Sequence, residues 1–499
     1  MNTSKGKWRL ALCGVLFIAV RAQAECAGAQ IESWITTPDR SQLLARRAEC
    51  IAFADQTDHW HLPIIVDERQ SFQPVDGFGF ALTGGSAEHL HTMSAPARRK
   101  VLRELFGNGS GEIGISYLRL TLGASDLNSF VYSYDDLPDG QVDPELKRFS
   151  LGHDHDHVIP VLKEILEISP RLKIMASPWS APTWMKDNNK WRGGSLRPEY
   201  YAAYARYFVK YVLEMRKLGV AIDAITVQNE PLNFKNTPSM LFSPQQQAEF
   251  IKSHLGPAFA AAGLTTKIVV FDHNLDRPDY PLGVLADPAA AKYIDGSAFH
   301  HYGGDMQTLS MVHLARPDKN LYFTEQMVIE EPGSGAIAIA IEVQRLIVGA
   351  MRNWSRNLVL WNLAADAEHK PHTDDGGCTM CQGALTIERD EVTRNLAYYT
   401  LAHASKFVGP GSTRIYSTDA ADMAVLSTTD QDRPEVHRAT LVPRSDVLPN
   451  VAFRTPDRKI VLVVANVSWT ATKVDVQYRG RWARLPLPPG AAGTFVWDE

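Results

Sequence analysis

The sequence predicts an α/β protein, a (β/α)8 TIM barrel with an appended β-sandwich domain. Eight short apolar runs lie between Val75 and Asp366, and amphipathic helical patterns separate most of them, as expected for buried parallel strands and their covering helices. Two of these runs end in a glutamate, at the end of the strand where barrel enzymes place their chemistry. Beyond residue 408 the helical period disappears, and short strand-like runs separated by turn residues remain.

The expected barrel strands follow one another in a regular order. They are GFGFALT, ISYLRLTLG, LKIMASPWS, IDAITVQNE, KIVVFDHN, IDGSAFHHY, NLYFTEQ and NLVLWNLAAD. The helical patterns are APARRKVLRELF, HVIPVLKEILEI, EYYAAYARYFVKYVLEMRKLG, PQQQAEFIKSHLGPAFAAAG and AIAIAIEVQRLIVGAMRNW, and TRNLAYYTLAHASKF follows the eighth strand. Eight such units are the number that closes a TIM barrel, whose site is built at the carboxyl ends of the strands.

Composition divides the chain into four segments. We expect a signal peptide over residues 1–24, an N-terminal segment over 25–74, the catalytic barrel over 75–407 and the sandwich over 408–499. The last segment contains the strand-like runs VAFRTPDR, KIVLVVANVS, KVDVQYRG, RWARLPLPPG and TFVWDE. We expect the N-terminal segment to pack with it through HLPIIVDER, because chain ends often lie close together.

The first residues are typical of a cleavable signal peptide. Lys5, Lys7 and Arg9 precede the apolar run LALCGVLFIAV, and AQA at residues 22–24 supplies a small-x-small cleavage pattern. The run is shorter than the ~20 apolar residues of a membrane-spanning helix. We therefore expect a secreted or periplasmic protein with no stable membrane anchor, a retained anchor being the alternative.

Overall composition excludes some classes of partner. The chain has 499 residues, 45% of them apolar and 21% charged, so a large core is expected. A net charge of −5 and the lack of a long basic run argue against nucleic acid. No pattern in the sequence indicates a cofactor.

Four cysteines would remain after cleavage, and export favours disulfides between them. Nearest-neighbour pairing gives Cys26–Cys50 and Cys378–Cys381, which is one of three possible connectivities. The CTMC spacing also suits half of a zinc site or a redox pair. Export to an oxidising compartment favours a structural disulfide over both.

Two glutamates, Glu230 and Glu325, are the candidate catalytic residues. Each closes an apolar run, AIDAITVQNEP and KNLYFTEQ respectively. Two carboxyl groups that face each other across a pocket are what glycosidic bond hydrolysis requires. One protonates the leaving oxygen, and the other stays ionised to attack the anomeric carbon. For either glutamate alone, a helix cap or a salt bridge is the commoner role.

Six segments, in this order, resemble glycoside hydrolase family 30: GFGFALTGGSAEHL, ASPWSAPTWMK, VQNEP, FHHYGGD, YFTEQ and LWNLAAD. The likeness is to the glucosylceramidase-like branch, which includes lysosomal acid β-glucosidase, and it runs from about Val75 to the C-terminus. It implies a retaining β-glycosidase with Glu230 as acid/base and Glu325 as nucleophile, ~5–5.5 Å apart. Their mutual repulsion should raise the pKa of Glu230 while Glu325 stays ionised.

The resemblance also assigns supporting residues to the sugar site. They are Asn229, Trp179, Trp361, Arg119, Tyr302, His300 and Asp126. We expect Asn229 to hold the sugar 2-hydroxyl, the two tryptophans to stack on the sugar ring, and Tyr302 to donate a hydrogen bond to Glu325. Arg119 either keeps Glu325 ionised or forms a structural ion pair. Asp126 is interpreted as a loop cap rather than a sugar contact.

The run HDHDH at residues 153–157 suggests a different kind of hydrolase. Three histidines at alternate positions beside two aspartates suit a metal site, but their spacing is one residue short of HxHxDH. The run also opens a helical pattern, for which Asp154 or Asp156 would be the N-cap. We expect no metal, whereas a metallohydrolase would lose its activity with a chelator.

Two segments depart from the glucosylceramidase-like pattern. GGS at residues 84–86 stands where the lysosomal relatives have an aspartate for the distal glucose hydroxyls, and the loop HKPHTDDGGCTMCQG lacks their asparagine-rich segment. Asp126, Asp374 or Asp375 would have to supply the missing contact. We expect hydrolysis of a β-linked glycoside or oligosaccharide, foremost a β-glucoside and including glycolipids, with modest selectivity for glucose over xylose. An endo-β-1,6-glucanase or β-xylosidase of the same family, and a non-catalytic carbohydrate-binding barrel, are the alternatives.

Overall fold

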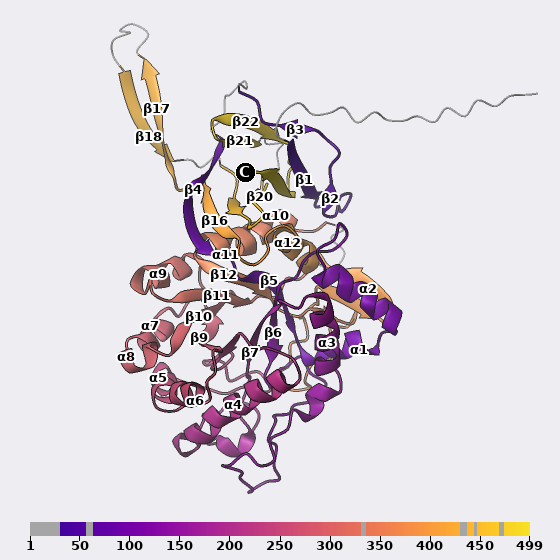
Figure 1. Ribbon diagram of the computed structural model, residues 1–499, viewed down its shortest axis with the longest axis vertical. Helices are drawn as coiled ribbons and strands as arrows, with labels where there is room; N and C mark the ends of the chain where they lie inside the picture. The colour runs from indigo at the N-terminus through magenta and orange to yellow at the C-terminus, as the bar shows by residue number, and fades with distance from the viewer. Residues whose placement is uncertain (1–29, 56–62, 331–335, 430–436, 444–446, 469–473) are drawn as a thin grey trace, which may run out of the picture.

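The computed structural model describes residues 30–55, 63–330, 336–429, 437–443, 447–468 and 474–499. They form a closed barrel and a large, mostly antiparallel sheet, which lies above the barrel in Figure 1. The expected signal peptide and Cys26 lie outside the described residues, and so does the predicted Cys26–Cys50 pairing. Within these ranges no helix has the length and apolar character needed to cross a bilayer.

Eight parallel strands close the barrel in the spatial order β10-β11-β12-β5-β6-β7-β8-β9. Each strand therefore lies beside its successor in sequence, and the last one closes onto the first. The strands are β5 (Gly77–Leu82), β6 (Tyr117–Thr121), β7 (Lys173–Ser177), β8 (Ala224–Thr226), β9 (Lys267–Asn274), β10 (Ile294–His300), β11 (Asn320–Glu325) and β12 (Ser355–Leu360). Seven of them fall within the predicted apolar runs, and β12 begins two residues before its run, which confirms the fold class.

Helices surround the barrel (Figure 1). They are α1 (Gly84–Thr92), α2 (Ala95–Phe106), α3 (Val158–Ile168), α4 (Tyr201–Lys217), α5 (Pro244–Phe250), α6 (Gly256–Ala261), α7 (Asp279–Leu285), α8 (Pro288–Ala291), α9 (Gln307–Ala315), α10 (Ile339–Glu342), α11 (Gly349–Arg352) and α12 (Leu396–Ser405). The π-helical segments η4 (Ile251–Leu255) and η5 (Val343–Val348) continue α5 into α6 and α10 into α11. Short 3₁₀ turns are η1 (Gly152–His155), η2 (Thr183–Met185) and η3 (Pro198–Tyr200).

The second sheet joins both ends of the chain. Its strands are β1 (Gln30–Thr36), β2 (Ala45–Arg46), β3 (Ile51–Ala52), β4 (Ile64–Pro74), β16 (Thr413–Ser417), β19 (Asn450–Arg454), β20 (Lys459–Ala465), β21 (Val474–Tyr478), β22 (Arg481–Leu485) and β23 (Ala492–Asp498). The N-terminal strand β1 pairs with the C-terminal strand β23, and β4 pairs with both β16 and β21. Segments far apart in sequence therefore share one hydrophobic core.

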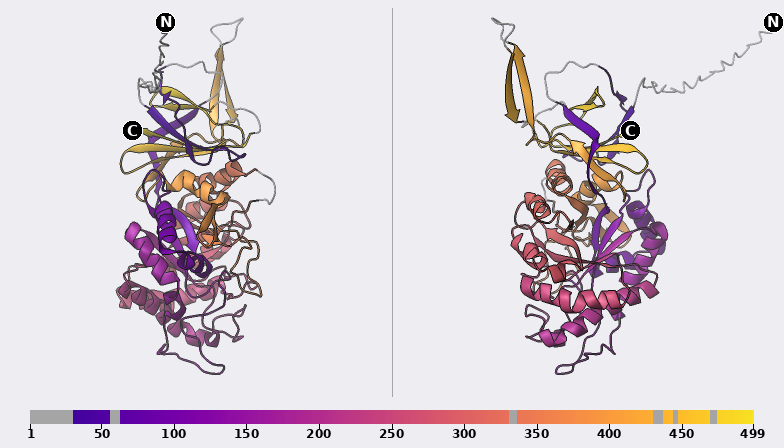
Figure 2. Two further views of the ribbon diagram at one scale, coloured as in Figure 1. Left: turned by 90° about the vertical axis from the view of Figure 1, so that its right-hand side faces the viewer. Right: turned by 60° about the vertical axis from the view of Figure 1, so that its left-hand side comes forward.

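Two smaller sheets complete the structure. The ribbon of β17 (Met423–Thr429) and β18 (His437–Pro443) projects from the sandwich in every view (Figure 2). The strands β13 (Ala364–Ala365), β14 (Leu385–Glu388) and β15 (Glu391–Arg394) form a sheet after the last barrel strand. The segment between β13 and β14 is the predicted strand-eight loop, and its Cys378 and Cys381 form a disulfide.

Strands β5 and β6 of the barrel lie so close together that the size of the side chain between them is limited. A Cβ at Gly79 on β5 would lie 1.6 Å from the carbonyl oxygen of Tyr117 on β6, so only glycine fits between these strands. A layer of side chains from seven strands fills the interior, as expected for a packed barrel. The layer is Tyr117, Met175, Ala224, Val269, Ala298, Tyr322 and Val359.

The HDHDH run has a different role from both of those predicted for it. Helix α3 begins at Val158, and its N-cap residue His157 makes no side-chain capping bond, so the capping prediction is wrong. Asp154 instead points inward, where it accepts hydrogen bonds of 2.6 and 2.7 Å from the hydroxyls of Tyr132 and Tyr134. The aspartate satisfies two buried tyrosines that would otherwise lack acceptors.

Candidate active site

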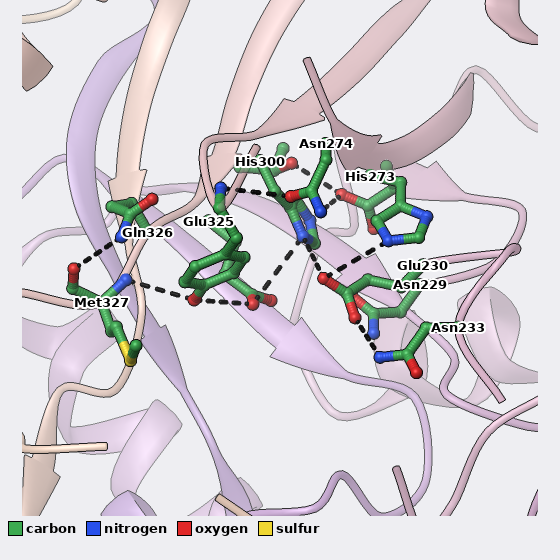
Figure 3. A network of polar contacts seen from close by, with 12 residues as sticks. Asn229, Glu230, Asn233, His273, Asn274, His300, Glu325, Gln326 and Met327 are labelled. Carbon is green, nitrogen blue, oxygen red and sulfur yellow. Dashed lines mark hydrogen bonds and ion pairs between the residues drawn. The ribbon is translucent and has the colours of Figure 1, made fainter. Parts of the chain in front are cut away.

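A cavity of about 680 Å³ opens where the loops after the barrel strands meet. Most of the predicted site residues line it: Asp126, Trp179, Asn229, Glu230, Tyr302, Glu325 and Trp361. Arg119 and His300 are fully buried and contact the two glutamates. The barrel therefore brings together every sugar-site residue that the sequence predicted. Figure 3 shows Asn229 and His300 beside the two glutamates.

The two glutamates face each other across this cavity. One carboxyl oxygen of Glu230, one of Glu325 and a ring nitrogen of His300 all lie within 4.8 Å of one another. Glu230 adopts φ 44°, a left-handed conformation that is rare outside glycine, and its N–H donates to the carbonyl of Asp272 at 2.9 Å. Glu325 ends β11 directly. Such local strain at one of two facing carboxylates is common at functional sites.

Arg119 ties the nucleophile candidate to the barrel interior. Its guanidinium lies 2.6 Å from Glu325 Oε2 and 2.8 Å from Asp272 Oδ2, and it donates to Asn229 Oδ1 at 2.7 Å. Both predicted alternatives for Arg119 therefore hold, since it pairs with Glu325 and also with a structural carboxylate. Trp179 adds to the cation's environment, because its ring centroid is 4.9 Å from the guanidinium carbon.

His300 and Tyr302 link the two carboxylates. His300 Nδ1 lies 3.1 Å from Glu230 Oε1, and its Nε2 lies 3.0 Å from Asp272 Oδ1. Tyr302 donates its hydroxyl proton to Glu325 Oε1 at 3.1 Å, as the sequence predicted. Each catalytic candidate is therefore oriented by a side chain from the end of β10 or from the loop that follows it.

The charges of these groups differ from the sequence-based expectation. Burial raises the pKa of Glu230, but the hydrogen bond and positive charge of His300 outweigh it and bring the pKa to about 2. Burial raises the pKa of Glu325 above its ordinary value, and His300 and Arg119 offset only part of that effect. The predicted order, with the raised pKa on Glu230, is therefore wrong, because His300 lies closer to Glu230 than to Glu325.

His300, which is within hydrogen-bond distance of Glu230, is the group that can supply a proton to it. Burial lowers the pKa of His300, but the charge of Glu325 and the bond to Asp272 raise it to about 9. Because the imidazole and Glu230 are 3.1 Å apart, they titrate as a pair that holds one proton up to that pH. The charge of Glu325 and the bond to Asp272 favour the imidazole over Glu230 as the site of that proton.

Two tryptophans and two polar groups of the predicted set line the cavity. The rings of Trp179 and Trp361 stack with centroids 5.5 Å apart. Since the Oδ1 of Asn229 accepts from Arg119, its amide nitrogen is the group left to donate into the cavity. Asp126 lines the cavity too, so the loop-cap interpretation is incomplete. Burial, then the charges of Glu325 and Glu230, raise its pKa to about 7.

The GGS corner leaves no space for the aspartate that the lysosomal relatives have there. A Cβ on Gly84 would lie 1.8 Å from the amide nitrogen of Asn128, so that side chain fills the corner. Asp374 and Asp375 do not line the cavity, and Asp375 pairs instead with Arg192 at 2.8 Å. Of the three acids considered for the missing contact, Asp126 alone is in position.

Sequence reasoning missed several residues of this site. Asp272 is fully buried and accepts from Arg119, Ser177, Thr226 and Thr324, which makes it the centre of the network. The sequence contains a signal for Asp272, because this residue lies near the end of the apolar run KIVVFDHN. The two glutamates lie near the ends of apolar runs in the same way. Asn233 left no comparable signal: it follows Glu230 in a loop and donates to Glu230 Oε2 at 2.7 Å.

The described residues contain one cluster able to hold a metal ion, formed by Glu230, His300 and Glu325 themselves. HDHDH does not form one in this part of the chain, because Asp154 is turned inward to its tyrosines and His153 is outward beside Asp156. A metallohydrolase at HDHDH therefore has no geometric support here.

Comparisons with known proteins agree with this geometry. Residues 75–408 match the model of the glycosyl hydrolase family 30 TIM-barrel domain, and residues 411–495 match that of the family 30 β-sandwich domain. An endo-1,6-β-D-glucanase of Aspergillus fumigatus is 36% identical over 71% of this chain and 74% of its own length. The lysosomal acid glucosylceramidase of Mus musculus is 29% identical over 87% of this chain and 83% of its own length. A solved structure of an endo-β1,6-glucanase has a TM-score of 0.81 and 31% identity, covering 94% of this chain and 100% of its own.

Proposed function

Because this chain belongs to glycosyl hydrolase family 30, we propose that it is a retaining β-glycosidase that hydrolyses β-1,6-linked glucan. The observation that carries the mechanism is the separation of the two carboxyl groups. Their nearest oxygens lie within 4.8 Å, whereas inverting enzymes keep their carboxyl groups ~6.5–9.5 Å apart to admit a water molecule. Glu325 is the nucleophile, and Glu230 is the acid/base.

In the first step Glu325 attacks the anomeric carbon and forms a glycosyl ester, while the bond to the leaving oxygen breaks. Glu230 delivers a proton to that oxygen. Since the proton resides on His300 beforehand, it reaches Glu230 through their 3.1 Å hydrogen bond. In the second step Glu230 takes a proton from water, whose oxygen attacks the anomeric carbon and releases Glu325.

The leaving group is proposed to be a sugar rather than a lipid. The A. fumigatus glucanase is more similar in sequence than the mouse glucosylceramidase, at 36% against 29% identity. Beyond Glu230 the cavity is lined by the apolar Leu232 and Phe234 and by Asn233, Lys235 and Arg192. The polar groups of these last three suit hydroxyls and would be costly to cover with an acyl chain. Both arguments favour β-1,6-glucan over a glycolipid.

Asp126 is the proposed contact to the distal hydroxyls of the sugar. A site built to hydrogen-bond a hydroxyl rejects analogues that lack it much more strongly than an apolar wall does. We therefore expect aryl β-glucoside to exceed aryl β-xyloside in kcat/KM by ~10² or more, and Asp126→Asn to narrow this gap. If the wild-type enzyme has similar kcat/KM values for aryl β-glucoside and aryl β-xyloside, Asp126 does not have this role.

We also propose that the protein is exported, on the strength of residues 1–24. The mature protein should begin near Glu25. Mass spectrometry of the N-terminal peptide from the culture medium or periplasm tests this, and an intact leader on cell-associated protein would contradict it.

A substrate screen tests the function directly. We expect β-1,6-glucan to be cut into oligosaccharides, and NMR at early times to show products of β configuration. Glucosylceramide and aryl β-xyloside should be poor substrates, and a chelator should leave the rate unchanged. α-Configured products would exclude the retaining mechanism. Glucosylceramide as the best substrate would restore the glucosylceramidase alternative.

A further inference from the structure

An aromatic side chain lies at the cavity rim just beyond the acid/base. Phe234 lines the cavity, and 55% of its surface is exposed, although phenylalanine is among the residue types that are most often buried. It follows Glu230 by four residues, in the loop after β8. The proposed mechanism assigns no task to it.

The turn that carries Phe234 is attached to the acid/base itself. Asn233 donates its backbone N–H to the carbonyl of Glu230 at 2.8 Å and its side-chain amide to Glu230 Oε2 at 2.7 Å. The same side chain accepts from the N–H of Lys235 at 2.8 Å. One asparagine therefore fixes both the carboxyl group of Glu230 and the backbone on each side of Phe234.

Two neighbouring loops pack against this turn. Gly376 has φ +82°, and a Cβ there would lie 2.4 Å from the carbonyl oxygen of Lys235, so the two backbones are in direct contact. A Cβ at Gly193 would lie 3.6 Å from Phe234 Cβ, in ordinary van der Waals contact. The backbone under Phe234 is thus closely packed while its ring is exposed to the cavity.

The position of the turn matches the side from which the leaving group departs. Glu230 lies between Glu325 and Asn233 (Figure 3). Glu325 attacks one side of the anomeric carbon, so the leaving oxygen and the sugar attached to it lie on the other side, next to Glu230. The first residue beyond Asn233 with a large apolar surface is Phe234.

We propose that Phe234 is the stacking platform for the glucosyl residue on the leaving-group side, and thereby a specificity-determining residue; this rests on the proposed function. An aromatic face suits the C–H face of a pyranose ring. A 1,6-linkage has one more rotatable bond than linkages to ring hydroxyls, so the leaving sugar loses more freedom when it is positioned. A platform mounted on the acid/base turn supplies that positioning.

Substitutions of Phe234 test this with two kinds of leaving group. With β-1,6-glucooligosaccharides, Phe234→Ala should lower kcat/KM about tenfold, mostly through KM, as expected from the loss of a partly buried ring. With β-glucosyl fluoride, whose leaving group has no ring, the loss should be much smaller. Phe234→Trp and Phe234→Tyr should retain the wild-type preference. Phe130→Ala is the matched control, since Phe130 is 51% exposed and does not line the cavity.

Transfer to an acceptor sugar provides an independent measurement. The acceptor occupies the leaving-group position and competes with water for the glycosyl ester, so Phe234→Ala should lower the ratio of transfer to hydrolysis from β-glucosyl fluoride. Equal losses on fluoride and oligosaccharide, or an unchanged transfer ratio, would overturn the platform. Failure of the wild-type enzyme to cut β-1,6-glucan would instead overturn the proposed function, and the transfer ratio would still decide the role of Phe234.

Discussion

The cavity has a buried inner wall, which contains the Arg119–Glu325 pair, and an exposed rim, which contains the Arg192–Asp375 pair. The two pairs have nearly the same length but differ in burial. Arg119 lies 2.6 Å from Glu325, with side chains 0% and 7% exposed. Arg192 lies 2.8 Å from Asp375, with side chains 42% and 79% exposed. Water screens the outer pair and is excluded from the inner one, so nearly equal distances correspond to very different energies. The inner wall is fixed by buried charges, whereas the rim is fixed by backbone packing.

This difference predicts where substitutions are costly. Breaking a buried ion pair leaves an uncompensated charge, at a cost of about 3–5 kcal/mol. On the inner wall each polar group also contacts two or more others, so one substitution disturbs several. At the rim, a lost side chain is replaced by water. We therefore expect effects to decrease from the nucleophile outward.

The largest effect is expected for Glu325→Gln. A neutral amide cannot form the glycosyl ester, so kcat for an aryl β-glucoside should fall by at least about 10⁴-fold. Oligosaccharide binding, measured by calorimetry, should largely persist, because the amide fills the same volume. Near-normal turnover would exclude Glu325 as the nucleophile, and with it the catalytic function of the inner wall.

Glu230→Ala should have an effect that depends on the leaving group. Loss of the general acid costs about 10²–10⁴-fold with β-1,6-glucan, but much less with an activated aryl group that needs little protonation. Added azide should restore turnover and give a β-glycosyl azide. An α-azide would show that the two glutamates exchange roles or that the mechanism is inverting.

A pH profile tests the pairing of Glu230 with His300. In the wild-type enzyme the pair holds its proton until pH rises through the His300 pKa of about 9, so the alkaline limb of kcat/KM should lie in that range. His300→Gln removes the charge that lowers the pKa of Glu230, so that pKa should rise. The proton is then held by a carboxyl group alone, and the alkaline limb should move down in pH. An unchanged limb would show that His300 does not share the proton.

The barrel and its two glutamates could be predicted because they follow from local patterns. Short apolar runs separated by helical patterns predict the strands, and Glu230 and Glu325 end two of these runs. The prediction of the glucosylceramidase-like branch is not favoured by the comparisons, because the A. fumigatus glucanase is 36% identical to this chain and the mouse glucosylceramidase 29%. Motifs of the inner wall identify the reaction rather than the leaving group.

The features that could not be predicted depend on distances between segments far apart in sequence. The low pKa of Glu230 requires His300, 70 residues away, to lie within hydrogen-bond distance. Asn128 fills the Gly84 corner through a contact that no helical or strand period encodes. Phe234 belongs to the rim, where the backbone of the adjoining Lys235 packs against Gly376 of the strand-eight loop. Such positions become recognisable only when the fold is assembled.

The smallest effect is expected for the outer pair itself. Arg192→Ala, Asp375→Ala and the double variant form a thermodynamic cycle across the rim, linking the loop after β7 to the strand-eight loop. Because both side chains are exposed, their coupling in kcat/KM should be less than about fivefold and should disappear in high salt. Asp375→Asn, which keeps the shape and removes the charge, is the matched control. Coupling of about a hundredfold or more that resists salt would mean that bound glucan buries this pair. The rim would then behave like the inner wall, and the distinction between the two regions would fail.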